Sequence, residues 1–170
     1  EKDSEAVSKL WDSIFEINRI NTADPIQAWK DHFEKLEKFK IYLNEKQFAK
    51  LYYKGENTDL TVDLPKNHIW QGGCEHTTKG LVFAANIPTE EVFCMPYKYG
   101  VNGVLSSTMP LEYNGNIIDN FKFYFENGKI VSFEAEKGYA TLENLLSSDE
   151  ASRYLGEVAI VPVSSPIYKT

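Results

Sequence analysis

Cysteine is scarce in this sequence. Its 170 residues include two cysteines, Cys74 and Cys94, too few for a framework of disulfides. Because small secreted domains depend on such frameworks, we expect a reducing compartment and predict a cytoplasmic location. No apolar run approaches the roughly 18 residues that a membrane-spanning helix needs, and no secretory signal peptide is visible. The sequence therefore predicts no membrane partner.

Positive charge is also in short supply. The chain has 18 lysines and arginines against 25 aspartates and glutamates, which gives a formal net charge of −7. Nucleic acids and anionic membranes repel an acidic surface, so we expect neither as a main partner. The length and the 42% hydrophobic content are ordinary for a globular protein that buries a core.

The first part of the chain has helical patterns. Apolar side chains recur at helical spacing over residues 4–20, which predicts an amphipathic helix. Asp24 followed by Pro25 is a start signal for a second helix, with the aspartate as N-cap. The lysines and glutamates along this helix predict a solvated face, and His32 among them is given no role. Its expected apolar stripe comprises Ile26, Trp29, Phe33 and Leu36, with Phe39 or Leu43.

Strand patterns dominate after residue 48. Residues 51–53 and 59–64 read as two strands with a turn between them, and alternation predicts that the second strand buries one face. Asn127-Gly128 favours a tight hairpin between strands over 117–125 and 130–135. A helix is expected over 139–146. The side chains expected on the buried face of the second strand are Leu60, Val62 and Leu64.

These patterns predict an α+β fold: two N-terminal amphipathic helices followed by a mainly antiparallel β-sheet portion with one or two further helices. Pro65 to Asn67 end a strand and mark a candidate boundary. We therefore expect residues 1–65 to form a helical segment with the first hairpin, and residues 66–170 to form the strand-rich portion.

Two glutamates lie in unusually apolar local sequence. Glu91 and Glu157 are each followed directly by a valine. A carboxylate carried among buried side chains is costly unless a metal ion, a lysine or an arginine meets it. In an extended segment the side chains of Glu90 and Glu91 point to opposite faces, so one of them should face solvent. Metal ligation by Glu91 and Glu157 is one interpretation; an ion pair at Glu157 with an exposed Glu91 is the other.

A small zinc site is a second metal hypothesis. His68, Cys74 and His76 lie close together in the sequence. Their spacing fits no structural zinc pattern, which normally supplies four ligands. We expect them instead to be turn and loop residues around Gly72-Gly73.

Four motifs together resemble a known family, and they follow one another in that family's order. The motifs are Thr58-Asp59-Leu60-Thr61-Val62 with Leu64-Pro65, His68-Ile69-Trp70 with Gly72-Gly73, Asn86-Ile87-Pro88-Thr89-Glu90-Glu91-Val92-Phe93, and Tyr154-Leu155-Gly156-Glu157-Val158-Ala159. From about Asp24 to Thr170 the chain resembles the thermophilic-type metallo-aminopeptidases, the aminopeptidase T and aminopeptidase S family.

The resemblance implies a homodimeric exopeptidase that releases N-terminal amino acids from peptides with two divalent metal ions, zinc or cobalt. Glu91 and Glu157 match the two glutamate ligands of the family. The other ligands, two histidines, a tyrosine and an aspartate, are expected beyond Thr170, and a large region is expected before Glu1. We therefore expect an internal fragment that is inactive by itself, with no general base assigned.

Two other functions fit the sequence. One is a non-catalytic binding module. The other is a glycoside hydrolase that uses Glu91 and Glu157 as acid and nucleophile, which needs carboxylates roughly 5–9.5 Å apart. Sensitivity to metal chelators would separate the glycosidase from the peptidase.

Overall fold

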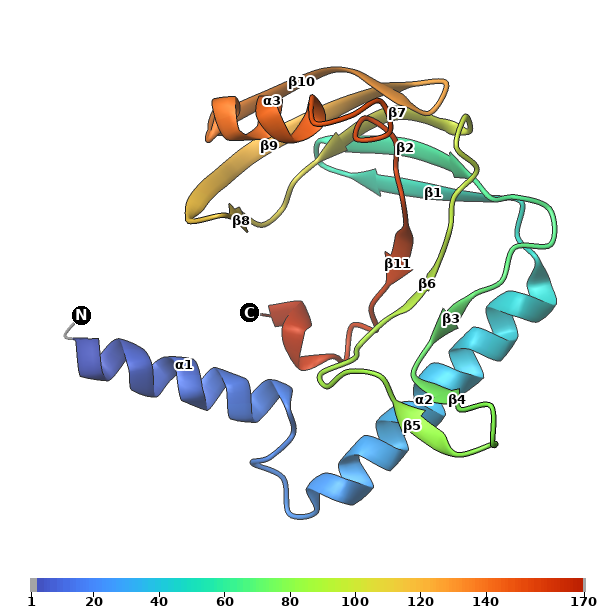
Figure 1. Ribbon diagram of the computed structural model, residues 1–170, viewed down its shortest axis with the longest axis vertical. Helices are drawn as coiled ribbons and strands as arrows, with labels where there is room; N and C mark the ends of the chain where they lie inside the picture. The colour runs from blue at the N-terminus through green and yellow to red at the C-terminus, as the bar shows by residue number, and fades with distance from the viewer. Residues whose placement is uncertain (1–2, 170) are drawn as a thin grey trace. The chain divides into compact units, whose positions relative to one another are not determined.

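The computed structural model describes residues 3–169, which form two compact units built from separated stretches of chain (Figure 1). Unit 1 combines Glu1–Lys46, Ile69–Cys94 and Ala159–Thr170, and unit 2 combines Gln47–His68 and Met95–Val158. The boundary after residue 65 stays a prediction about domain organisation.

Unit 1 begins with helices α1 (Asp3–Ile17) and α2 (Pro25–Lys46). Asp24 caps α2 as expected, because its Oδ1 accepts a hydrogen bond from the backbone N–H of Gln27 at 2.9 Å. Leu36 and Leu43 are buried on α2, whereas Ile26 is 71% exposed. The prediction for Ile26 was wrong, since the buried part of the stripe begins after the first turn of the helix.

The remaining elements of unit 1 are short. The sheet has the strand order β11-β6-β3, in which β6 (Val92–Cys94) is central between β11 (Val158–Ile160) and β3 (Gln71–Gly72). Strands β4 (Cys74–His76) and β5 (Val82–Ala84) pair with each other, and η1 (Pro166–Lys169) is a 3₁₀ turn.

A side chain of α2 fixes the approach to β3. The Asn44 amide accepts a hydrogen bond from the backbone N–H of Trp70 at 2.8 Å and donates one to the Trp70 carbonyl at 3.0 Å. Trp70 itself is 1% exposed. This two-way bond satisfies both backbone groups of a buried residue and ties the strand to the helix.

Unit 2 is built on a six-stranded antiparallel sheet. Its order is β1-β2-β7-β9-β10, with β8 pairing to β9. Helix α3 (Tyr139–Leu146) packs on β9 and β10, as Figure 1 shows. The strands are β1 (Lys50–Gly55), β2 (Thr58–Asp63), β7 (Val101–Ser106), β8 (Leu111–Tyr113), β9 (Asn116–Glu126) and β10 (Lys129–Lys137).

The predicted hairpin joins β9 to β10. Glu126 pairs with Lys129 across a two-residue loop, in which Asn127 has φ 48° and Gly128 φ 85°. Two consecutive positive φ values are those of a type I′ turn, whose twist matches that of the strands. The sequence-based prediction of this hairpin is confirmed.

The α+β fold class is confirmed. In the described part of the chain, two N-terminal helices precede mainly antiparallel sheets and one further α-helix. The residues predicted for the buried face of β2 and its end are buried as expected: Leu60 is 2% exposed, Val62 0% and Leu64 7%. Among residues 3–169, no helix combines the length and the apolar character needed to cross a bilayer.

Replacing the α2 cap should measure its contribution. Asp24→Ala removes the side-chain acceptor for the Gln27 N–H, so we expect a loss of about 1 kcal/mol in the free energy of unfolding by chemical denaturation. Asp31→Ala is the control, because it removes only the bond from the Gln27 side chain on the same helix, worth about 0.2–0.5 kcal/mol. Equal losses for both variants would show that Asp24 does not act as a cap.

Candidate functional site

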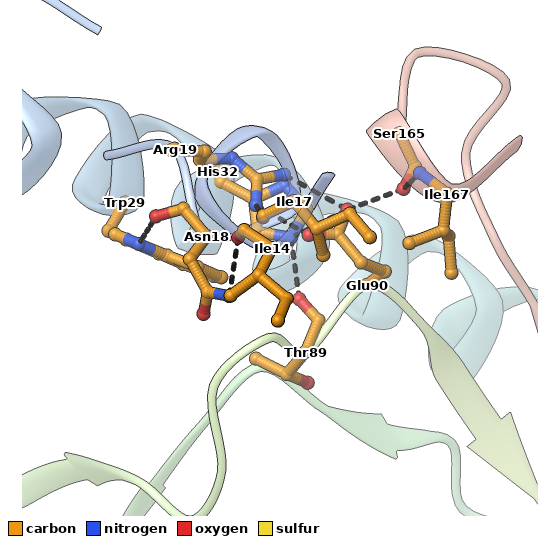
Figure 2. Close-up of polar contacts among 10 residues, drawn as sticks. All are labelled: Ile14, Ile17, Asn18, Arg19, Trp29, His32, Thr89, Glu90, Ser165 and Ile167. Carbon is orange, nitrogen blue, oxygen red and sulfur yellow. Dashed lines mark hydrogen bonds and ion pairs between the residues drawn. The ribbon is translucent and has the colours of Figure 1, made fainter. Parts of the chain in front are cut away.

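The carboxylate of Glu90 is buried in unit 1 and meets an arginine. Glu90 is 4% exposed and lies two residues before β6. Arg19 donates from Nη1 to Glu90 Oε1 at 2.5 Å and from Nη2 to Oε2 at 2.9 Å, as Figure 2 shows. Two parallel N–H···O bonds fix the orientation of both planar groups as well as their distance. The pair ties the connection between α1 and α2 to the loop that enters β6.

Arg19 is itself held by its neighbours. Its guanidinium carbon lies 4.4 Å from the ring centroid of Trp29, an attractive contact between a cation and an aromatic face. The Trp29 indole N–H donates to the Asn18 carbonyl at 2.9 Å, and Arg19 Nη1 also donates to the Ile17 carbonyl at 3.2 Å. The helix connection and the first turns of α2 thus aim the guanidinium at Glu90.

Two more polar side chains complete the surroundings of Glu90. The Ser165 hydroxyl donates to Glu90 Oε2 at 2.6 Å. His32 Nε2 lies 2.8 Å from the Thr89 carbonyl and 3.6 Å from Glu90 Oε2. The carbonyl can only accept, so Nε2 carries the hydrogen. Arg19, His32, Thr89, Glu90 and Ser165 are called the Glu90 cluster below.

The cluster has a defined charge. Burial disfavours the Glu90 carboxylate, but the hydrogen bonds from Arg19 and Ser165, with the positive charge nearby, outweigh it and lower the pKa of Glu90. Burial lowers the pKa of His32 by more than the Thr89 carbonyl and Glu90 raise it. At neutral pH the site therefore holds one ionised carboxylate, one guanidinium and a neutral imidazole.

The sequence predicts that a carboxylate in this segment needs a positive partner, but it does not identify the residues that surround Glu90. The expectation that a carboxylate among buried side chains needs a cation holds for Glu90, and the cation is a side chain 71 positions away. The roles of His32, Arg19 and Ser165 were missed. One signal was present: Arg19 is one of two arginines among 18 basic residues, and arginine is the usual partner for a buried carboxylate.

Glu91 and Glu157 belong to different units. Glu91 is partly buried in unit 1 and directly precedes β6, while Glu157 is exposed in unit 2 and directly precedes β11. Their convergence on one metal site stays a prediction.

The backbone of Glu91 lies against a glycine. Gly72 of β3 pairs with Val92 of β6 and has φ +132°. A Cβ at Gly72 would clash with the Glu91 carbonyl oxygen and would lie 3.1 Å from the Val92 Cα. Only glycine allows the two strands to approach this closely at the residue proposed as a ligand.

The donor set in this chain is incomplete for a metal centre. Among residues 3–169, no group of three or more His, Cys, Asp and Glu side chains is placed to hold an ion. This applies to His68, Cys74 and His76 as well: His68 is buried in unit 2 with Nδ1 3.0 Å from the Pro65 carbonyl, whereas Cys74 and His76 lie on β4 in unit 1. Burial raises the pKa of the Cys74 thiol, which disfavours the metal-binding thiolate.

Substitution of Gly72 should displace the segment that carries Glu91. Gly72→Ala adds a clash with backbone atoms to an unfavourable φ, so we expect a loss of about 1–3 kcal/mol in the free energy of unfolding. Gly80→Ala is a matched control, because Gly80 also has a positive φ (+80°) but a Cβ there meets nothing within 4 Å. Comparable losses in the two variants would mean that the backbone contact with Glu91 contributes nothing.

The stability of the chain should fall as the pH falls through the titration of His32. Because its pKa in the folded chain lies below the ordinary value of 6.5, the unfolded chain binds a proton first, and protonation favours unfolding below that value. We expect the thermal midpoint to begin to drop as the pH falls through the ordinary value of 6.5, to keep dropping until His32 is protonated in the folded chain as well, and to drop less in His32→Gln. Parallel pH curves for the two proteins would rule out His32 as the cause.

Comparisons with known proteins match nearly the whole of this chain. The family model of the thermophilic metalloproteases (M29) matches residues 1–170. Aminopeptidase AmpS from Bacillus subtilis is 51% identical over 165 residues, covering 97% of this chain and 40% of that protein. Aminopeptidase 2 from Geobacillus stearothermophilus is 49% identical over 166 residues, covering 98% and 40% respectively.

A solved structure agrees with the sequence comparison. The structure of wild-type AmpT from Thermus thermophilus superimposes with a TM-score of 0.90 at 42% identity, covering 99% of this chain and 41% of that one. The chain thus spans about two fifths of the length of the relatives it matches. A match over every residue, at these identities, means that the chain belongs to the thermophilic metalloprotease family.

Proposed function

We propose that this chain is part of a metal-dependent aminopeptidase that releases N-terminal amino acids from peptides. The observation that carries the proposal is the family match over residues 1–170, together with two relatives that are each named as aminopeptidases. A cytoplasmic location and a homodimer belong to the same proposal, and neither follows from the geometry.

Glu91 and Glu157 are the proposed metal ligands of this chain. Carboxylate oxygens suit hard and borderline divalent ions, which supports zinc or cobalt as the metals. A zinc ion takes about four ligands, and residues 3–169 contain no group of three or more His, Cys, Asp and Glu side chains placed to hold one. The proposal therefore assigns the remaining ligands to residues outside the described part of the chain.

Bound divalent ions would polarise the scissile carbonyl and lower the pKa of a bound water. The residues of this chain would supply oxygen ligands from two segments, each entering a strand of the β11-β6-β3 sheet. Neither glutamate is assigned as general base, because a carboxylate engaged with a metal ion is a poor acceptor for the proton of the water. Without a full ligand set, we expect the 170-residue chain alone to show no peptidase activity.

The test uses the longer protein that we propose to contain this chain. Glu91→Ala and Glu157→Ala should each lower the metal content and reduce kcat/KM on aminoacyl-anilide substrates by at least about 100-fold, since even residues that only support ligands are worth about 10–100-fold. Glu56→Ala, at an exposed turn between β1 and β2, is the control and should leave both unchanged.

Chelation gives an independent reading of the same site. Removing the metal should abolish the activity, and added zinc or cobalt should restore it. Activity that is indifferent to chelation would reject the metallopeptidase. It would favour a hydrolase that uses the two carboxylates directly, such as a glycosidase.

A further inference from the structure

We propose that Glu90 is a positioning residue: held by Arg19 and Ser165, next to the Thr89 carbonyl that His32 holds, it fixes the segment that presents Glu91 to the metal. The inference rests on the proposed function, because it gives Glu90 a part in that reaction without contact to substrate or metal. It assigns the buried charge of unit 1 a function beyond folding.

The segment is clamped immediately before Glu91. His32 holds the Thr89 carbonyl, and three donors surround the Glu90 carboxylate: the two guanidinium nitrogens of Arg19 and the Ser165 hydroxyl. These contacts come from α2, from the connection before it and from the last segment of unit 1 (Figure 2). Two successive residues are thus fixed by groups from three separate stretches of chain.

The segment is also clamped immediately after Glu91. Val92 is 0% exposed in the central strand of the β11-β6-β3 sheet, and it pairs with Gly72. The backbone of Gly72 lies so close to the Glu91 carbonyl that a Cβ at position 72 would clash with its oxygen. Glu91 itself is only partly buried, whereas Glu90 is 4% exposed. This difference is expected where neighbouring side chains point to opposite sides.

Stability alone is a weak explanation for the charges. Burying a carboxylate and a guanidinium carries a desolvation penalty for each group, and apolar side chains of similar volume are often as stabilising or more so. What the ion pair adds is direction, because the planar fork of arginine permits one orientation of the carboxylate. A site that must hold its ligand within about 0.5 Å needs this kind of support.

The test compares Glu90→Gln and Ser165→Ala with a matched structural control in the complete metal-loaded protein. Glu90→Gln keeps the size of the side chain but removes its charge, and Ser165→Ala removes one donor while the ion pair remains. Thr77→Ala is the control, since it removes the hydrogen bond that the Thr77 hydroxyl accepts from the Leu81 N–H in the β4–β5 turn of the same unit, outside the contacts that hold residues 89–92. For each variant the readouts are cobalt affinity, the visible absorption spectrum of bound cobalt, kcat, KM and the thermal midpoint.

We expect Glu90→Gln to weaken cobalt binding and lower kcat by about 10–100-fold, with a shifted cobalt spectrum and a smaller change in KM. Ser165→Ala should change the same readouts by less. Thr77→Ala should lower the thermal midpoint and leave cobalt affinity and spectrum as in the wild type. If Glu90→Gln does not fold, Ser165→Ala decides by the same readouts.

Two contrary results are distinguishable. If Glu90→Gln or Ser165→Ala behaves as Thr77→Ala does, with a lower midpoint but unchanged cobalt affinity and spectrum, the positioning role is rejected while the proposed function stands. If Glu91→Ala keeps both metal and activity, the proposed function fails, and the positioning role fails with it.

Discussion

The buried ion pair between Arg19 and Glu90 is the constraint on which unit 1 depends. Its partners are 71 positions apart, and Ser165 adds a bond to the same carboxylate from 75 positions further along the chain. A buried charge needs a partner that compensates it. If any of the three segments moved away, a buried charged or polar group would lose its partner, which is energetically costly. A single carboxylate thereby joins a helix connection, a strand entry and the last segment of the unit.

Two adjacent glutamates differ in their surroundings, and we propose different roles for them. The pattern of carboxylates beside large apolar residues predicts that a cation will be found, and the structure supplies Arg19 for Glu90. Glu91, the next residue, is the proposed metal ligand. Placing a structural charge beside a proposed ligand would couple the geometry of the second to the packing of the first, since both share the same short stretch of backbone.

The sequence predicts the local parts of the structure best. Asp24 caps α2, Asn127-Gly128 forms the β9–β10 turn, and alternation identifies the buried face of β2, because each depends on residues within a few positions. The family resemblance came from long motifs and is confirmed by the comparisons. The partner of Glu90 could not be predicted, because no local pattern encodes a contact between segments so far apart. His32 was dismissed for the same reason: its neighbours in sequence are charged, while its contacts are not local.

The interruption of unit 1 by unit 2 has a consequence for the order of folding. Most strand pairs of unit 2 join segments that are close in the chain, such as β1 with β2 and β9 with β10, and pairings of this kind form early. Unit 1 must close the long loop between Glu90 and Ser165, and residues 95–158 within that loop belong to unit 2. Once those residues are structured, closing the loop costs less entropy than in a flexible chain. On this argument, the Glu90 cluster should form after the local strand pairs of unit 2.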